Sequence, residues 1–126
     1  MSGITKIGQI GIAVADINLA KDFYQKILGL ELLFEAPPGL AFFNCGGVRL
    51  MLTTLQGLEQ DHKTSVIYYQ VDDIEYASKQ LKAKNVVFER EPQLAVKMPD
   101  HDLWMAFLRD PDNNLIGLMA EMPLST

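Results

Sequence analysis

The side chains that could do chemistry occupy alternate positions of short apolar segments. Arg49 and Met51 lie two residues apart in one segment, and Gln9 and Tyr68 lie in two others. Because successive side chains of a strand point to opposite faces, these four are predicted to share the more polar face of a sheet. An arginine placed there could bind a carboxylate or phosphate through two hydrogen bonds. The alternative is an ion pair with an internal acidic residue, or exposure at a strand end.

One histidine falls in a segment that could border a site. His101 stands between two aspartates in Pro99-Asp100-His101-Asp102, shortly before Trp104. At a cavity mouth it could act as acid, base or ligand contact. A solvated loop histidine is the interpretation that we favour. His62 is predicted to be plain surface, and neither histidine belongs to a metal-spacing motif.

The composition is that of one compact globular domain, residues 1–126. Hydrophobic residues make up 48% of the chain, which is enough for a core. Eleven basic and sixteen acidic residues give a net charge of −5. That charge argues against a nucleic-acid partner, which needs a basic surface, and leaves neutral or cationic small ligands open.

Other sequence features limit the compartment. Cys45 is the single cysteine, so no internal disulfide and no thiolate-rich zinc cluster can form. No apolar run reaches the roughly 20 residues of a membrane-spanning helix. Residues 1–6 lack the apolar region of a signal peptide. We therefore expect a cytoplasmic protein with no membrane partner.

The chain contains an internal repeat. Residues 9–16, QIGIAVAD, align with residues 66–73, VIYYQVDD, and residues 43–52 resemble residues 107–118 with two extra residues at the turn. Such self-similarity indicates one structural unit used twice. We predict module 1 at about 4–55 and module 2 at about 66–122, joined by a polar linker at about 56–65 within a single domain.

Each module is predicted to contain a strand, a helix and three more strands. An apolar stripe at helical spacing from Ala20 to Leu28 predicts the first helix, which Asp16 would cap and Gly29 would end. The second helix would be capped by Asp72 or Asp73 and end at Asn85. Strands are expected at 9–14, 31–35, 41–44, 48–54, 66–71, 86–90, 103–109 and 115–120.

The two faces of these predicted strands differ in composition. One face is almost wholly apolar and must be covered, and the two helices are the available cover. The other face is mixed, which predicts a small-molecule cavity, with a dimer interface or a partly wet sheet face as the alternative. The mixed set is Gln9, Gly11, Ala13, Arg49, Met51, Thr53, Val66, Tyr68, Gln70, Leu115, Gly117 and Met119.

Three segments resemble the vicinal oxygen chelate superfamily of glyoxalases, epimerases, extradiol dioxygenases and bleomycin-resistance proteins. They are GQIGIAVADINLAKDFYQKILGLEL at 8–32, VIYYQVDDIEYASKQL at 66–81 and FLRDPDNNLIGLM at 107–119. The resemblance covers nearly the whole chain. It implies an α+β fold in which tandem βαβββ modules form an open eight-stranded mixed half-barrel with the helices outside. It also implies a homodimer.

The resemblance further implies one divalent metal, whose ligand positions correspond to Gln9, Met51, Val66 and Gly117 in this chain. A glutamine amide oxygen can coordinate, but a methionine thioether is a soft ligand that suits Zn²⁺, Ni²⁺, Mg²⁺ and Mn²⁺ poorly. Valine and glycine have no side-chain donor. We therefore expect no metal of the family type and no other cofactor.

The favoured interpretation is a metal-free protein of the bleomycin-resistance kind that binds a small molecule. Its cavity would be bounded by Gln9, Arg49, Met51, Tyr68 and Trp104, with His101 as a further candidate. Three alternatives stay open. The first is an enzyme of glyoxalase/lyase, epimerase or dioxygenase type with an atypical or metal-independent site that uses His101, Arg49 or Tyr68. The second is a metalloenzyme with ligands from elsewhere, such as His101 with Asp100 or Glu35. The third is an interaction module with a filled barrel.

Divalent metal is expected to leave the stability of the protein unchanged. A ligand that binds only the folded state raises the melting temperature with its concentration. Thermal unfolding of protein purified without chelator or metal-affinity tag, titrated with Zn²⁺, Ni²⁺, Mn²⁺ and Fe²⁺, should therefore show no saturable rise. Near-stoichiometric metal by elemental analysis, or a large saturable shift, would contradict this expectation.

Overall fold

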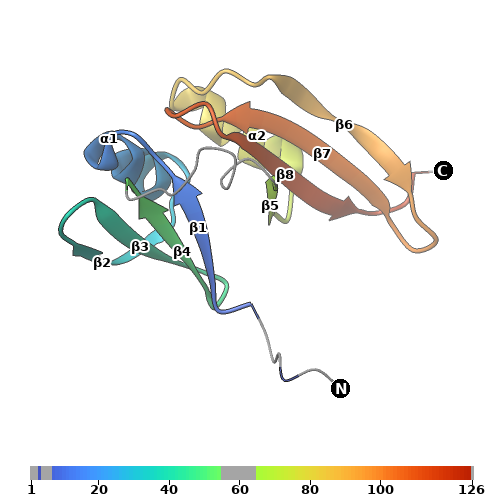
Figure 1. Ribbon diagram of the computed structural model, residues 1–126. Helices are drawn as coiled ribbons and strands as arrows, with labels where there is room; N and C mark the ends of the chain where they lie inside the picture. Colours follow the sequence, from blue (N-terminus) through green and yellow to red (C-terminus); the bar gives the residue numbers. More distant parts are fainter. Residues whose placement is uncertain (1–2, 4–6, 55–64, 126) are drawn as a thin grey trace. The chain divides into compact units, whose positions relative to one another are not determined.

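The computed structural model describes residue 3 and residues 7–54 and 65–125. The chain forms two compact units, Met1–Ser65 and Val66–Thr126, which we call module 1 and module 2 (Figure 1). The boundary falls where the sequence repeat begins again. The predicted linker at 56–65 lies outside the described residues, apart from Ser65.

Module 1 is built as a strand, a helical segment and three more strands. Its elements are β1 (Gln9–Ala13), α1 (Ile17–Asp22), the π-helical turn η1 (Phe23–Ile27), β2 (Glu31–Ala36), β3 (Leu40–Cys45) and β4 (Val48–Thr53). The sheet order is β1-β4-β3-β2, and β1 runs parallel to β4 while the other pairs are antiparallel (Figure 1). The last strand of the module therefore lies beside the first.

The first helical segment has the extent that the sequence predicts. Its hydrogen bonding changes from α-helical to π-helical at Phe23. The Asp16 carboxylate accepts hydrogen bonds from the backbone of Asn18 and Leu19 at 3.0 and 3.1 Å, which caps α1. Gly29, with φ of 77°, follows the end of η1. The buried Tyr24 ring lies 6.2 Å from the ring of Phe43, so this segment covers the Phe43 face of the sheet.

Module 2 repeats the plan. Its elements are β5 (Ile67–Gln70), α2 (Ile74–Ala83), β6 (Arg90–Lys97), β7 (Asp102–Arg109) and β8 (Leu115–Met122), with sheet order β5-β8-β7-β6. Asp73, rather than Asp72, caps α2 through hydrogen bonds from the backbone of Glu75 and Tyr76, and Asn85 follows the helix with φ of 69°. Two βαβββ modules with mixed sheets confirm the predicted α+β fold. No helix among the described residues is long and apolar enough to span a membrane.

The strand predicted at 86–90 is wrong. Val87 is 87% exposed, and the strand instead begins at Arg90 and runs to Lys97. It contains Pro92, which has no N–H to donate to a neighbouring strand. Because β6 is an edge strand whose pairing with β7 shifts between Arg90 and Gln93, the proline lies at an irregularity where it is tolerated.

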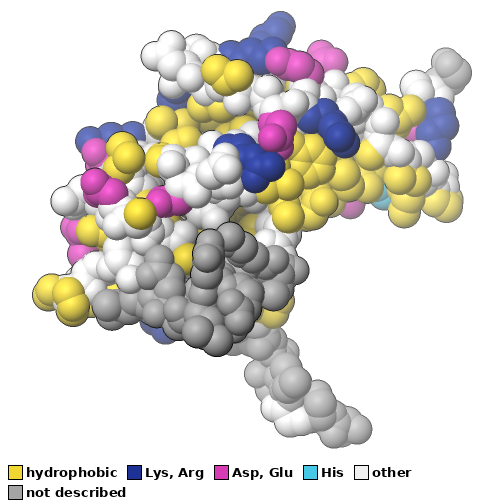
Figure 2. Space-filling view, turned by 45° about the horizontal axis from the view of Figure 1, so that its top comes forward, with side chains coloured by type: hydrophobic (Ala, Val, Ile, Leu, Met, Phe, Trp, Pro, Cys, Tyr) yellow, Lys and Arg dark blue, Asp and Glu magenta, His cyan; other side chains and the backbone are white. Residues whose placement is uncertain are grey.

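Strand β6 also exposes apolar side chains. Leu94 is 41% exposed and Val96 is 48% exposed. Figure 2 shows hydrophobic side chains gathered over the second module, beside several Lys and Arg side chains. Charged neighbours are one way in which natural edge strands avoid pairing with other chains.

The strand register separates each sheet into two faces. In module 1, Ile10 pairs with Leu50 on the face that α1 covers, and Gly11 pairs with Met51 on the opposite face. In module 2, α2 contacts β6, β7 and β8 on the face that carries buried Leu118. We call the covered side the helix face and the opposite side the distal face. The predicted apolar and mixed sets fall on these two faces.

Glycines on the distal faces make room for large neighbours in the parallel strand pairs. Tyr68 pairs with Gly117, and a Cβ added to Gly117 would lie 2.5 Å from Cδ2 of the Tyr68 ring. In module 1 the order is reversed. Gly11 on the first strand faces Met51 on the last, and a Cβ on Gly11 would lie 3.6 Å from the Met51 methyl carbon. The Tyr68 ring therefore lies directly over the backbone of β8.

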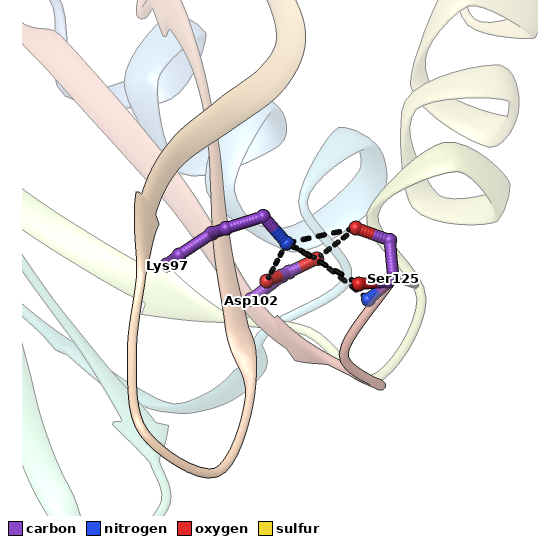
Figure 3. A network of polar contacts seen from close by, with 3 residues as sticks. All are labelled: Lys97, Asp102 and Ser125. Atoms are coloured by element: carbon purple, nitrogen blue, oxygen red, sulfur yellow. Dashed lines mark hydrogen bonds and ion pairs between the residues drawn. The ribbon is translucent and has the colours of Figure 1, made fainter.

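A buried carboxylate binds the C-terminal segment of module 2 to the start of β7. Asp102 is 2% exposed and accepts hydrogen bonds from the Lys97 ammonium at 3.1 Å and from the backbone and hydroxyl of Ser125 at 3.1 and 2.9 Å (Figure 3). Burial alone would raise the pKa of the Asp102 carboxyl. The hydrogen bonds from Lys97 and Ser125 and the charge of Lys97 outweigh it and hold this pKa below its usual range.

The change Gly117→Ala is expected to lower the free energy of unfolding by about 1–3 kcal/mol, because the new methyl group would overlap the Tyr68 ring. Gly11→Ala is the matched control, since its methyl group would make an ordinary contact with Met51, and it should change stability by about 0.5 kcal/mol or less. Urea denaturation measures both. Equal effects of the two substitutions would contradict the close packing of Tyr68 on Gly117.

Asp102→Asn is expected to lower the melting temperature at neutral pH. The folded-state pKa lies below the unfolded value of about 3.9, so the carboxylate stabilises the fold above that pH. This contribution is lost as the pH falls through the folded-state pKa. The difference in melting temperature between the wild type and the variant should therefore shrink below about pH 4.

Thermal unfolding followed by circular dichroism from pH 7 to acid measures this difference. The exposed Asp72 gives the control variant Asp72→Asn, which should follow the wild type at every pH. A gap for Asp102→Asn that stays constant down to the acid limit would show that the carboxylate charge is not what stabilises the C-terminal segment.

Candidate functional site

Three of the predicted site residues contact one another on the distal face of module 1. Gln9 is the direct cross-strand partner of Arg49 in the β1–β4 pair. The Arg49 Nε donates a hydrogen bond of 2.8 Å to the Gln9 Oε1, and the Gln9 Nε2 lies 3.5 Å from the Met51 sulfur as a weak donor. The glutamine amide therefore links the guanidinium to the thioether. The predicted grouping of Gln9, Arg49 and Met51 on one face is present in the structure.

Two phenylalanines form the apolar part of this face. Phe42 pairs with Met51 across β3 and β4, and the Arg49 guanidinium carbon lies 5.3 Å from the centre of the Phe42 ring. Phe34 of β2 stacks on Phe42 with ring centres 4.5 Å apart and an interplanar angle of 23°. The face thus presents a cation beside two stacked rings, and Phe34 is 49% exposed.

The residues at the positions of the implied metal ligands do not fit a divalent cation. The one hard donor, the Gln9 amide oxygen, already accepts from Arg49. A metal at that oxygen would lie close to the guanidinium, and two positive charges at such a distance repel. Met51 offers only a soft thioether, and Gly117 offers no donor. Among the described residues, no group of three or more His, Cys, Asp or Glu side chains is arranged to hold a metal ion.

Module 2 carries a related arrangement on its own distal face. The Tyr68 and Phe107 rings meet edge to face with centres 5.8 Å apart, and both residues pair with Gly117. The Arg90 guanidinium carbon lies 5.6 Å from the Phe107 ring centre. Met105 and Met119 pair with each other on the same face. Each module therefore has an arginine close to a phenylalanine ring on its distal face.

Some residues of these faces do not emerge from the sequence pattern. Phe34, Phe107 and Arg90 were not among the candidate residues. Phe34 and Arg90 lie on β2 and β6, whose pairing contains register shifts, so simple alternation does not give their face. In the structure Phe107 occupies, in the second hairpin, the place that Phe42 holds in the first, whereas the sequence repeat aligns Phe107 with Phe43, so the repeat does not give its face.

Trp104 and His101 lie away from the Tyr68 and Phe107 rings on the distal face of module 2. Trp104 pairs with Ala120, which shares the helix face with Leu118, so its side chain leaves the sheet on the side opposite to Tyr68. His101 precedes β7 and bonds the neighbouring Asp100 carboxylate at 2.8 Å. It lies six residues before Phe107, roughly 20 Å along an extended strand. One small ligand does not span that distance.

Cys45 is a poor nucleophile in this fold. It lies at the end of β3, next to the Gly46-Gly47 turn, where both glycines have positive φ. Burial raises the pKa of the Cys45 thiol, so the thiolate form is scarce at neutral pH. The surroundings of Cys45 therefore argue against a role as a catalytic nucleophile.

Solved structures of similar architecture cover almost the whole chain. A lactoylglutathione lyase from Agrobacterium tumefaciens is 20% identical, with a TM-score of 0.73 over 93% of this chain and 94% of that one. TnmS3, an antibiotic binding protein from Streptomyces sp. CB03234, is 23% identical, with a TM-score of 0.73 over 98% and 100%. A glyoxalase/bleomycin resistance protein/dioxygenase from Alicyclobacillus acidocaldarius is 18% identical, with a TM-score of 0.71 over 92% and 91%. At these identities the likeness shows the fold.

A comparison with curated proteins finds no match for the sequence. The family profile of the Glyoxalase/Bleomycin resistance protein/Dioxygenase superfamily, by contrast, matches residues 6–118. That match reaches into both modules and includes the distal-face residues described above except Met119. The chain therefore belongs to the glyoxalase/bleomycin resistance protein/dioxygenase superfamily.

Proposed function

We propose that this protein binds a small organic molecule on the distal faces of its sheets, without a metal of the family type. The observation that carries the proposal is the state of Gln9. Its amide oxygen, the one hard donor that the ligand positions contain, accepts a hydrogen bond from Arg49, which places a positive charge beside that oxygen. The family resemblance places a metal ligand at that position, so we do not expect the metal-dependent chemistry of the family's enzymes in this chain.

The composition of the distal faces supports binding. Ligand sites combine apolar and aromatic walls with a few fixed polar groups. Module 1 offers Phe34, Phe42 and Met51 around one amide and one guanidinium. Tyr68 in module 2 is 44% exposed although it is a large aromatic residue. The likeness to an antibiotic binding protein is in line with a binding role.

The methionines provide a direct test of the proposal. Met51 lies on the distal face of module 1 and Met105 and Met119 lie on that of module 2, whereas Met122 pairs with Asp102 on the helix face. In protein labelled with methyl-¹³C methionine, compounds from a library of small aromatic and heteroaromatic molecules should shift the signals of distal-face methionines. The Met122 signal should stay unchanged and serve as the internal control.

The same titration repeated with excess chelator tests the metal-free part of the proposal. Binding should persist with an unchanged dissociation constant. A library without a compound that shifts Met51, Met105 or Met119 would overturn the binding role. Binding that disappears with chelator and returns with one divalent metal would overturn its independence of metal.

A further inference from the structure

We propose that the distal face of module 1 recognises a planar aromatic carboxylate, in which Arg49 pairs with the carboxylate and the Phe34–Phe42 stack receives the ring. The inference rests on the proposed function, because it assigns a ligand class to one of the faces that binding would use. It differs from the expectation that the net charge of −5 gives, which is a neutral or cationic ligand.

Arg49 is oriented by the protein and still has donors to offer. Its Nε is bound to Gln9 at 2.8 Å, which fixes one edge of the guanidinium. A guanidinium has five N–H groups, so the two terminal nitrogens keep four donors in the planar geometry that matches a carboxylate. A side chain that is already held in place loses less conformational freedom when a ligand binds.

The described part of the chain does not supply a carboxylate for Arg49. Arg109, by comparison, pairs with Glu89 at 3.2 Å, and Lys21 pairs with Glu35 at 3.3 Å. Within residues 7–54 and 65–125, no aspartate or glutamate forms an ion pair with Arg49. A cation held by an amide, with no acidic partner among the described residues, is complementary to an anionic group of a ligand.

Glu31, an acidic residue on the same face, is hydrogen-bonded to Asn44 and not to Arg49. Glu31 of β2 accepts a hydrogen bond of 3.3 Å from the Asn44 amide, and Asn44 is the cross-strand partner of Arg49. The asparagine thus lies between the glutamate and the arginine in the sheet. The charged side chain that contacts the Phe42 ring is the Arg49 guanidinium, although the whole chain is acidic.

The aromatic part of the ligand follows from the stack. Phe34 lies on Phe42 in a nearly parallel arrangement and is 49% exposed, so one face of the pair has no protein ring upon it among the described residues. Flat ligand rings pack on exposed phenylalanine rings with ring centres about 4.5–7 Å apart. Phe42 is 8% exposed, so the ligand ring would pack on Phe34, and its acid could reach Arg49, which lies 5.3 Å from the centre of the Phe42 ring on which Phe34 stacks.

The test compares 2-naphthoate with its neutral analogue 2-naphthamide. Both have the same ring system, and only the first carries a charge. Dissociation constants from calorimetry, with the Met51 methyl signal to locate binding, should show naphthoate bound about tenfold more tightly or better, as a charged hydrogen-bonded pair predicts. Arg49→Gln should remove this preference and change the affinity for naphthamide less than about twofold.

Two variants separate the parts of the site. Gln9→Glu places a carboxylate against the Arg49 Nε, so it should reduce naphthoate binding as strongly as Arg49→Gln while the guanidinium stays present. Phe34→Leu should weaken both compounds by a similar factor of about three to ten, because it removes ring stacking and leaves the charge. Lys26→Gln on the η1 turn removes the same charge from an exposed side chain that pairs with Asp22, and should change neither affinity.

The outcomes distinguish this inference from the proposed function. Equal affinities of naphthoate and naphthamide at the Met51 signal would overturn the inference and leave ligand binding in place. A preference for naphthoate that survives Arg49→Gln, or shifts only Met105 and Met119, would also overturn it. If no aromatic compound moves any of these three signals, the proposed function fails as well. Thermal unfolding of each variant confirms that it is folded.

Discussion

Parallel pairing of the first and last strand in each module is the constraint on which the rest of the structure depends. It places Gln9 opposite Arg49 and Tyr68 opposite Gly117. Because side chains alternate along a strand, one such pairing decides which residues pack under the helix and which remain on the distal face. A shift of one residue would bury Arg49 and expose Leu50, which is 2% exposed in this register.

The hydrogen bond between Arg49 and Gln9 follows from that register. It bears on whether Gln9 can serve as a metal ligand. A glutamine at this position could be a metal ligand in a chain with three other hard donors. Here its oxygen accepts from a guanidinium and its neighbours are a thioether and two phenyl rings. In the proposed function, the same residues that fit a metal poorly bind a flat organic molecule instead. The family gives the fold, and the side chains at the site determine the function.

The sequence predicts the fold well because the signals that define it are local. Alternating apolar positions predict seven of the eight strands to within about three residues, a boundary error that is usual for such patterns. Asp16, Asp73 and Asn85 mark helix ends as expected. The strand predicted at 86–90 fails because Val86, Val87 and Phe88 have the composition of a strand, whereas the chain pairs with β7 further on, at an edge where Pro92 is accommodated in a register shift.

The candidate site is predicted less completely, for a physical reason. Gln9, Arg49 and Met51 lie on two neighbouring strands without register shifts. The alternation of side chains along a strand therefore predicts that they share a face. Phe34 and Arg90 lie on strands with register shifts, where this prediction fails. The face of Trp104 depends on how the chain turns at residues 110–114, where the Asp110 carboxylate accepts hydrogen bonds from the backbone of Asp112 and Asn114. Sequence spacing alone does not show which residues of β7 lie on the same face as Gly117 and Met119 of β8.

A crystal structure of the protein with bound 2-naphthoate would show where the ligand lies. We expect its carboxylate within about 3 Å of the terminal nitrogens of Arg49, with its rings against Phe34 and the Gln9 to Arg49 hydrogen bond intact. Naphthoate bound against the helix face, or an Arg49 that pairs with an acidic side chain of the protein itself, would contradict this expectation.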